Sequence, residues 1–212
     1  MRKNIIYSLL LVVAALFAGC ESRLDIEKHG NMGDQNDFYQ TDEQTEQAVA
    51  SMYSSLKGLY YNWFFTKNLL SDDVWCGGGQ RGDNTSLEQL NEYTYGTDNG
   101  MIQGVFSGLY GLIYQSNLVI EKVADDTPAK KRAIAEAKFF RAWANFELVT
   151  LWGTAPLVDH LLEPGEYRQG NSTPEALWAA VESDLNDAFS MNALPSKKNK
   201  DDQETGMRVT QE

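Results

Sequence analysis

The hydrophobic positions between residues 133 and 152 recur every three to four residues, which predicts a long and mostly buried helix. Phe139, Trp143, Phe146 and Val149 form one apolar stripe, and Phe140, Ala144, Leu148 and Leu151 form its neighbour. Two adjacent stripes leave little of the helix circumference for solvent. Gly153 can end this helix in a left-handed conformation, and Pro156 cannot continue it, so we expect an extended segment at 157–158.

Two segments before this helix show the same period. Thr41 and Gln44 have the spacing of a capping box, which predicts a helix whose inward face consists of Ala48, Val49, Met52, Tyr53 and Leu56. The segment 104–123 carries a second stripe, made of Leu109, Ile113, Ser116 and Ile120. The small residues Ser107 and Gly108 would let a neighbouring helix approach it closely.

A last helix is predicted to begin at Thr173, whose hydroxyl can cap it, with Pro174 in the first position. It should bury Leu177, Val181, Leu185 and Phe189 and end before Leu194. The short turn at 125–128 makes the two helices that flank it antiparallel neighbours. The pattern predicts an all-α fold, but no period near 34 residues repeats, so periodicity alone indicates only a helical bundle.

The polar segment 71–99 is the candidate binding region. It contains three successive glycines and many amide and carboxylate side chains, and loops of this length are often functional. Sugars present hydroxyl groups and flat apolar C–H faces, so a sugar site combines a stacking aromatic ring with hydrogen-bonding side chains. The residues of this kind are Trp75, Gln80, Arg81, Asp83 and Asn84, although an ordinary surface loop has a similar composition.

Patterns for a cofactor, a metal or a catalytic centre are missing from the sequence. The glycines at 77–82 lack the Lys-Ser/Thr of a phosphate loop, and His29 and His160 have no metal-ligand spacing. The acidic pairs at 72–73 and 201–202 are not followed by calcium-loop ligands, and no carboxylate pair is singled out for glycoside hydrolysis. We therefore expect no cofactor and no enzymatic activity.

The chain of 212 residues has a net charge of −12, and its length suits one medium-sized domain. An acidic surface repels polynucleotides and anionic lipids, so nucleic acid is not an expected partner. Neutral ligands remain possible. If Cys20 is lipidated, Cys76 has no partner for an intrachain disulfide, and the fold must be stabilised by packing.

The first twenty residues have the pattern of a bacterial lipoprotein signal. A basic start is followed by an apolar run at 5–17 and by Ala-Gly-Cys, which predicts a signal peptide at 1–19 and acyl chains such as palmitate on Cys20. The run is shorter than the roughly 20 residues of a spanning helix, which argues against a transmembrane anchor. The polar segment 20–37 is then a tether.

The residue patterns of several segments also resemble those of one known protein family. They are EAKFFRAWANFELVTLWGTAPLV at 136–158, LDI at 24–26, FYQTDE at 38–43, YGLIYQSN at 110–117, Thr173-Pro174 with Leu185 and Ala188, and GMRVT at 206–210. Together they resemble the starch-utilisation-system D-like (SusD/RagB) family of nutrient-binding lipoproteins. In such proteins an EA-(aromatic/Leu)-RA-(aromatic) helix runs into LWG or LFG and then a Pro.

This resemblance implies tetratricopeptide-like helix pairs with a long polar loop. It also implies a lipid-anchored protein on the outer membrane of a Gram-negative bacterium. Such a protein would bind an oligosaccharide, or a peptide, and pass it to a SusC-like TonB-dependent transporter. Because family members are longer, residues 38–212 would be an N-terminal helical domain that is incomplete at its C-terminus, with ligand contacts shared between the 71–99 loop and the missing part.

Two other functions stay open at the level of sequence. One is a helical-repeat scaffold or assembly lipoprotein without a small ligand, which an apolar groove between the helices would favour. The other is a surface hydrolase, whose signature would be loss of activity when a single carboxylate is changed.

Overall fold

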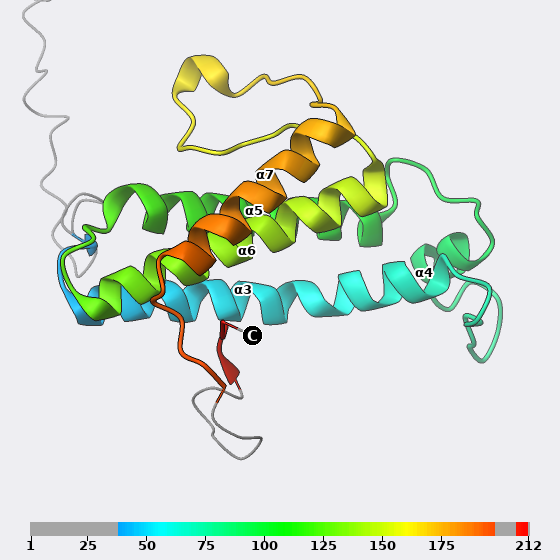
Figure 1. Cartoon of the computed structure of the whole chain (residues 1–212). Helices are drawn as coiled ribbons and strands as arrows, with labels where there is room; N and C mark the ends of the chain where they lie inside the picture. Colours follow the sequence, from blue (N-terminus) through cyan, green and yellow to red (C-terminus); the bar gives the residue numbers. More distant parts are fainter. Residues whose placement is uncertain (1–37, 198–206, 212) are drawn as a thin grey trace, which may run out of the picture. The chain divides into compact units, whose positions relative to one another are not determined.

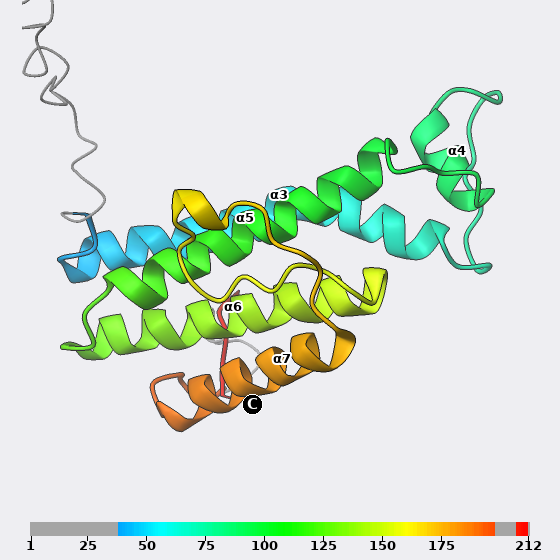
Figure 2. The same cartoon turned by 90° about the horizontal axis from the view of Figure 1, so that it is seen from above.

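The computed structural model describes residues 38–197 and 207–211, which belong to one folded unit (Figure 1). The signal peptide, Cys20 and the tether predicted from the sequence lie outside the described residues. Consecutive long helices of this unit run antiparallel (Figures 1 and 2). They are α3 (Asp42–Leu69), α5 (Gly100–Lys122), α6 (Pro128–Trp152) and α7 (Pro174–Ser190), with a short α4 (Thr85–Asn91) and a 3₁₀ turn (Pro164–Glu166) between them.

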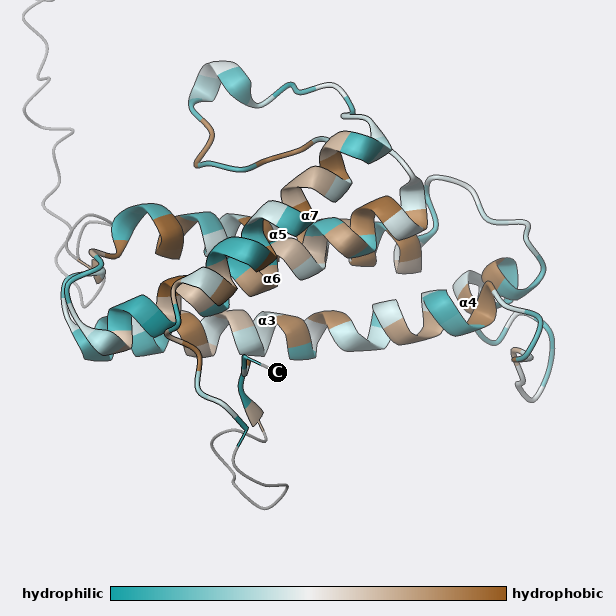
Figure 3. Ribbon diagram, viewed as in Figure 1, coloured by the Kyte–Doolittle hydropathy of each residue, from teal (hydrophilic) through white to brown (hydrophobic). Residues whose placement is uncertain are grey.

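The helices α3, α5 and α6 pack against one another, and α7 packs on α6. Apolar and hydrophilic residues alternate along these helices (Figure 3), as amphipathic packing requires. The all-α prediction is confirmed, and the described residues contain an isolated bridge, Ala155 to Ser172, but no strand. Within the described part of the chain, no helix is long and apolar enough to cross a membrane.

Side-chain caps set the beginnings of the long helices. The predicted capping box is confirmed, because the Thr41 hydroxyl accepts from the Gln44 amide and the Gln44 side chain accepts from the Thr41 amide. Asn99 caps α5 and Thr127 caps α6, so both helices begin about one turn earlier than their apolar stripes indicated. The first turn of α6, Pro-Ala-Lys-Lys, carries no apolar period. In α5 the first turn does contain the buried Met101, which packs with Leu69, Leu87 and Leu90 outside the Leu109 stripe.

The helix α6 is buried around most of its circumference, as its two stripes predicted. The close approach of α3 to α5 at Gly108 is also confirmed, because a Cβ atom there would lie 2.7 Å from Cδ1 of the buried Leu59. Ser107, by contrast, is exposed. Gly153 ends α6 with a positive φ of 75°, which glycine adopts without strain.

The predicted inward face of α7 is wrong in its second half. Leu177 and Val181 are buried as expected, but Leu185 is 42% exposed and Phe189 is 61% exposed. The buried stripe passes instead through Asp184 and Ala188, because Asp184 pairs with a buried arginine of α6. The aromatic stripe of α6 is likewise interrupted, since Phe146 is 37% exposed.

That arginine, Arg141, joins three helices and a loop. Its guanidinium donates two hydrogen bonds of 2.7 Å to Asp184 of α7, one of 2.8 Å to the Asn117 side chain of α5, and one of 2.6 Å to the Asp159 carbonyl. Arg141, Asp184 and Asn117 are all buried. A buried charge is tolerated only when it is paired and hydrogen-bonded, so this network determines how α7 and the 154–173 loop sit on α5 and α6.

A second buried charge fixes residues 207–211, here called the strap. Glu136 of α6 is fully buried and accepts hydrogen bonds from Arg132, from the Tyr53 hydroxyl of α3 and from Arg208 of the strap. Arg208 also donates to Glu46 at 2.9 Å, and the Val209 amide donates to the Tyr53 hydroxyl at 2.8 Å. The strap therefore lies across α3 and α6.

Candidate functional site

The candidate binding region connects α3 to α5, and it is not a loop throughout. Residues 85–91 form α4, which buries Leu87 and Leu90 against Leu69 and Met101. This helix is a correction to the sequence analysis, which took 71–99 as one polar loop. With only two apolar positions in seven residues, α4 is too short to show a helical period.

Carboxylates of this region hold its glycine-rich turn in one conformation. The Asp83 side chain accepts from the amides of Gly79 and Gln80, at 2.7 Å and 2.9 Å. The Glu88 side chain accepts from the Gly82 amide at 2.8 Å and 3.0 Å. Hydrogen bonds from backbone amides to a carboxylate order a turn that has little side-chain packing of its own.

Two further pairings tie the turn to α4. Arg81 forms an ion pair of 2.7 Å with Glu92, immediately after α4. The Asn91 side chain bonds the backbone on both sides of Trp75, because it accepts from the Cys76 amide and donates to the Val74 carbonyl. The backbone that carries Trp75 is therefore anchored although the residue lies in a loop.

The Trp75 side chain itself is 81% exposed. It borders a cavity of about 270 Å³, lined by Trp75, Cys76, Gly77, Gly78, Gln80, Arg81, Glu88 and Glu92. A large aromatic ring that contributes so little to packing, beside a hollow lined by polar groups, is suited to stacking on a ligand.

Three of the five residues predicted from the sequence line this cavity: Trp75, Gln80 and Arg81. Asp83 and Asn84 do not line it. Asp83 is engaged with the backbone of the turn, and Asn84 stands exposed at the beginning of α4, where its side chain makes no capping hydrogen bond.

Two lining residues, Glu88 and Glu92, were not among the predicted ones. They stand one turn apart, at α4 and just after it, on the side opposite to the buried leucines. The signal in the sequence that could have indicated them was the position of Glu88 between Leu87 and Leu90.

Burial, followed by the charges of Glu88 and Glu92, raises the pKa of the Cys76 thiol. This thiol therefore stays protonated at neutral pH and is a poor nucleophile.

The side chains that line this cavity are suited to binding a ligand. The cavity offers an aromatic face, an amide, a guanidinium and two carboxylates on an anchored turn. Among residues 38–197 and 207–211, no three acidic, histidine or cysteine side chains gather as the ligands of a metal ion would. The described site has the groups to hold a neutral, hydroxyl-rich molecule by stacking and hydrogen bonds.

Comparison with known proteins gives one consistent family. The family model described as "Starch-binding associating with outer membrane" matches residues 26–211. A SusD-like protein of Bacteroides ovatus is 32% identical over an alignment of 166 residues, and the match covers 72% of this chain and 29% of that protein. SusD-like protein P2 of Formosa agariphila is 26% identical over 205 residues, covering 90% of this chain and 40% of that protein.

Solved structures agree on the fold. A laminarin-binding SusD-like protein has a TM-score of 0.71 at 26% identity, over 82% of this chain and 38% of that one. Surface glycan-binding protein A from Bacteroides uniformis has a TM-score of 0.67 at 22% identity, over 81% of this chain and 39% of that one. The chain spans between 29% and 40% of the length of the curated relatives that it matches.

Proposed function

The chain belongs to the SusD-like family, and from this membership we propose that it is part of a non-catalytic lipoprotein that captures glycans at the outer membrane. The observation that carries the proposal is Trp75, an anchored and 81% exposed ring beside a polar cavity, in a chain of this family. An oligosaccharide is the proposed ligand, and an oligopeptide is the alternative cargo.

The names of the relatives support a sugar as the ligand. One similar structure is that of a laminarin-binding protein, and the matching family is described as starch-binding. Trp75 would stack on the C–H face of a sugar ring while Gln80 and Arg81 hydrogen-bond its hydroxyl groups. A site with one ring and a few hydrogen bonds yields modest affinity, on the order of micromolar or weaker. The entropic cost of ordering the ligand and the side chains offsets part of the free energy that each contact contributes.

The binding test uses a panel of soluble glycans, including laminarin and starch oligosaccharides, with affinity measured by calorimetry. The double variant Trp75→Ala/Gln80→Ala should weaken binding about tenfold or more, equivalent to about 1.4 kcal/mol, with unchanged helical circular dichroism. A matched control is Tyr167→Ala, which removes another exposed ring, 67% exposed, from a different loop. Equal binding by the wild type and the double variant would exclude the loop as the site.

The membrane anchor and the partner are also part of the proposal. Acyl chains on Cys20 would hold the protein at the outer membrane, and a SusC-like TonB-dependent transporter would receive the glycan. The acidic chain, with a net charge of −12, makes attachment through charge to anionic lipid unfavourable. Co-purification of a TonB-dependent transporter from solubilised outer membranes tests the hand-over, and glycan binding without it would restrict the function to capture.

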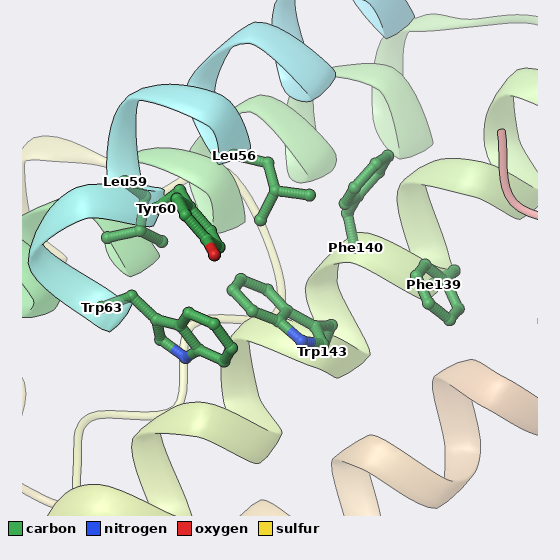
Figure 4. Close-up of a pocket in the computed structure, with 7 residues that line it drawn as sticks. All are labelled: Leu56, Leu59, Tyr60, Trp63, Phe139, Phe140 and Trp143. Atoms are coloured by element: carbon green, nitrogen blue, oxygen red, sulfur yellow. The ribbon is translucent and has the colours of Figure 1, made fainter. Parts of the chain in front are cut away.

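A scaffold function is the second candidate, and one observation favours it. An apolar groove, which the sequence analysis named as the sign of a scaffold, lies between α3 and α6 (Figure 4). If the protein is a scaffold without a small ligand, calorimetry should detect no binding of any glycan or peptide of the panel.

A further inference from the structure

Another cavity, here called the seam cavity, lies at the end of the helix bundle where α3 and α6 end and α5 begins (Figures 1 and 2). It encloses about 440 Å³ and is lined by Thr66, Leu70, Tyr95, Gly96, Thr97, Ile102, Leu151 and Trp152. Leu151 and Trp152 pack on the main core of the bundle. Leu70 and Ile102 pack on the small cluster that α4 buries. The cavity thus lies between two hydrophobic clusters, and its volume is within the range of roughly 300–1,000 Å³ that small-molecule sites have.

The Thr66 hydroxyl is a buried polar group without a partner. Thr66 is 2% exposed, and its Oγ1 atom has no hydrogen-bond partner among the described residues. Thr45 of the same helix is similarly buried, but its hydroxyl donates to the Thr41 carbonyl one turn earlier, at 2.9 Å. A buried hydroxyl without a hydrogen bond costs free energy. Because Thr66 lines the seam cavity, a molecule bound there can supply the missing partner.

Two aromatic residues give the seam cavity positioned apolar surfaces. The Tyr95 side chain is 40% exposed. Its backbone is held in place, because the carbonyl of the next residue, Gly96, accepts from the Asn99 amide at 3.2 Å. The Trp152 ring packs edge-on against Phe106, at 5.2 Å between centroids. Little ordering is therefore needed at these residues when a ligand with a flat C–H face binds, which favours its affinity.

The seam cavity differs from the cavity beside Trp75 in its charge. None of the eight described residues that line it carries a carboxylate, an ammonium, a guanidinium or an imidazole group. The cavity beside Trp75 is lined by Arg81, Glu88 and Glu92. Moving an ionised group out of water into a site without an opposite charge is unfavourable, so the seam cavity selects a neutral ligand. Its polar side chains offer hydroxyl groups and an indole N–H, which hydrogen-bond the hydroxyl groups of a sugar.

We propose that the seam cavity is a second sugar-binding site of this protein and that it takes one neutral sugar unit. The inference rests on the proposed glycan-binding function and adds a selection by charge that the cavity beside Trp75 does not provide. The Thr66 hydroxyl hydrogen-bonds a hydroxyl of the bound unit, and Tyr95 packs on its ring. A unit that carries a carboxylate or a sulfate is excluded from this position.

Two threonines of α3 provide a matched test, in the protein as its natural gene encodes it. Thr66→Val and Thr45→Val each replace a buried hydroxyl by a methyl group in the same helix. Without a ligand, Thr45→Val should lower the Tm by roughly 2–4 °C because it removes a hydrogen bond, whereas Thr66→Val should not lower it. In calorimetry with laminarin and starch oligosaccharides, Thr66→Val should weaken binding roughly three- to tenfold, and Thr45→Val should leave it unchanged.

The results separate the two sites. Binding that is weakened by Thr66→Val and not by Trp75→Ala/Gln80→Ala would keep the seam cavity and exclude the cavity beside Trp75. Binding that Thr66→Val leaves unchanged would overturn the present proposal alone. A Tm that Thr66→Val lowers as much as Thr45→Val does would also overturn it, because the hydroxyl would then already be used within the protein.

The selection by charge is tested with glucose and glucuronate, which differ in a carboxylate at C6. In the Trp75→Ala/Gln80→Ala background, saturation-transfer NMR should detect binding of glucose and no binding of glucuronate. Adding Tyr95→Ala should abolish the glucose signal without lowering the Tm by more than about 2 °C, since Tyr95 is half-exposed. Equal signals from the two sugars, or a glucose signal that Tyr95→Ala does not change, would contradict the proposal.

Discussion

At the scale of single residues, His160 lies between two carboxylates. Its Nδ1 is 2.7 Å from Asp159 and its Nε2 is 3.2 Å from Glu166, so the protonated ring can donate at both nitrogens. The hydrogen bond to Asp159, followed by that to Glu166, raises the pKa of His160 above its usual 6.5. The stabilisation by this pairing is fully present below the usual pKa and is lost as pH rises through the raised one.

We predict that an NMR titration of the His160 ring shows a midpoint above 6.5 and that Asp159→Asn moves the midpoint down. The substitution removes the largest cause of the shift and leaves the Asp159 carbonyl that accepts from Arg141. The other histidine of the chain, His29, serves as the internal reference. A midpoint that Asp159→Asn does not change would show that the side-chain pair is absent in solution.

Buried charges were the residues that the sequence analysis missed. Glu136, Arg141 and Asp184 are buried, although such residues are usually expected at the surface. A signal existed in the EA-(aromatic)-RA pattern of α6, since Glu136 and Arg141 are charged residues within a largely apolar stretch. Asn117 and Arg208 likewise belong to quoted segments. Part of the pattern that carries the family resemblance is therefore also the pattern of the buried polar networks.

At the scale of elements, the sequence predicted the existence of the long helices better than their faces. The capping box at Thr41 and the stop at Gly153 are local signals, which the sequence contains directly. Which side of α7 is buried depends on the position of Arg141 in a neighbouring helix, and periodicity cannot show this. The candidate site was found only in part for the same reason, because α4 is stabilised by contacts with Leu69 and Met101.

The packing of α3 against α5 gives a second prediction. Gly108→Ala should destabilise the protein by about 1–3 kcal/mol, because the new Cβ meets the buried Leu59 at 2.7 Å. Gly111→Ala, one turn further along α5 with no atom within 4 Å of the new Cβ, should stabilise it by about 0.5–1 kcal/mol. Urea unfolding measures both, and a stabilising Gly108→Ala would mean that the two helices are further apart than described.

At the scale of the whole molecule, the predicted lipid on Cys20 decides where the protein is found. We predict that Cys20→Ser moves it from the membrane fraction to the soluble fraction, because the substitution removes the thiol that would carry the acyl chain. Immunoblots of the two fractions measure this, with Cys76→Ser as the control because it removes the other thiol. A Cys20→Ser variant that stays in the membrane would indicate an uncleaved apolar segment as the anchor.

The strap has a consequence for the time course of biosynthesis. Arg208 and Glu46 are 162 positions apart, and at roughly 5–20 residues per second a ribosome needs about 8–30 s to add that many residues. Before Arg208 has been translated, the cationic partner available to Glu136 is Arg132, and Arg208 joins it afterwards. The ion pair between Glu46 of α3 and Arg208 thus forms only after α5, α6 and α7 have been translated, so α3 and α6 can pack on each other before the strap joins them.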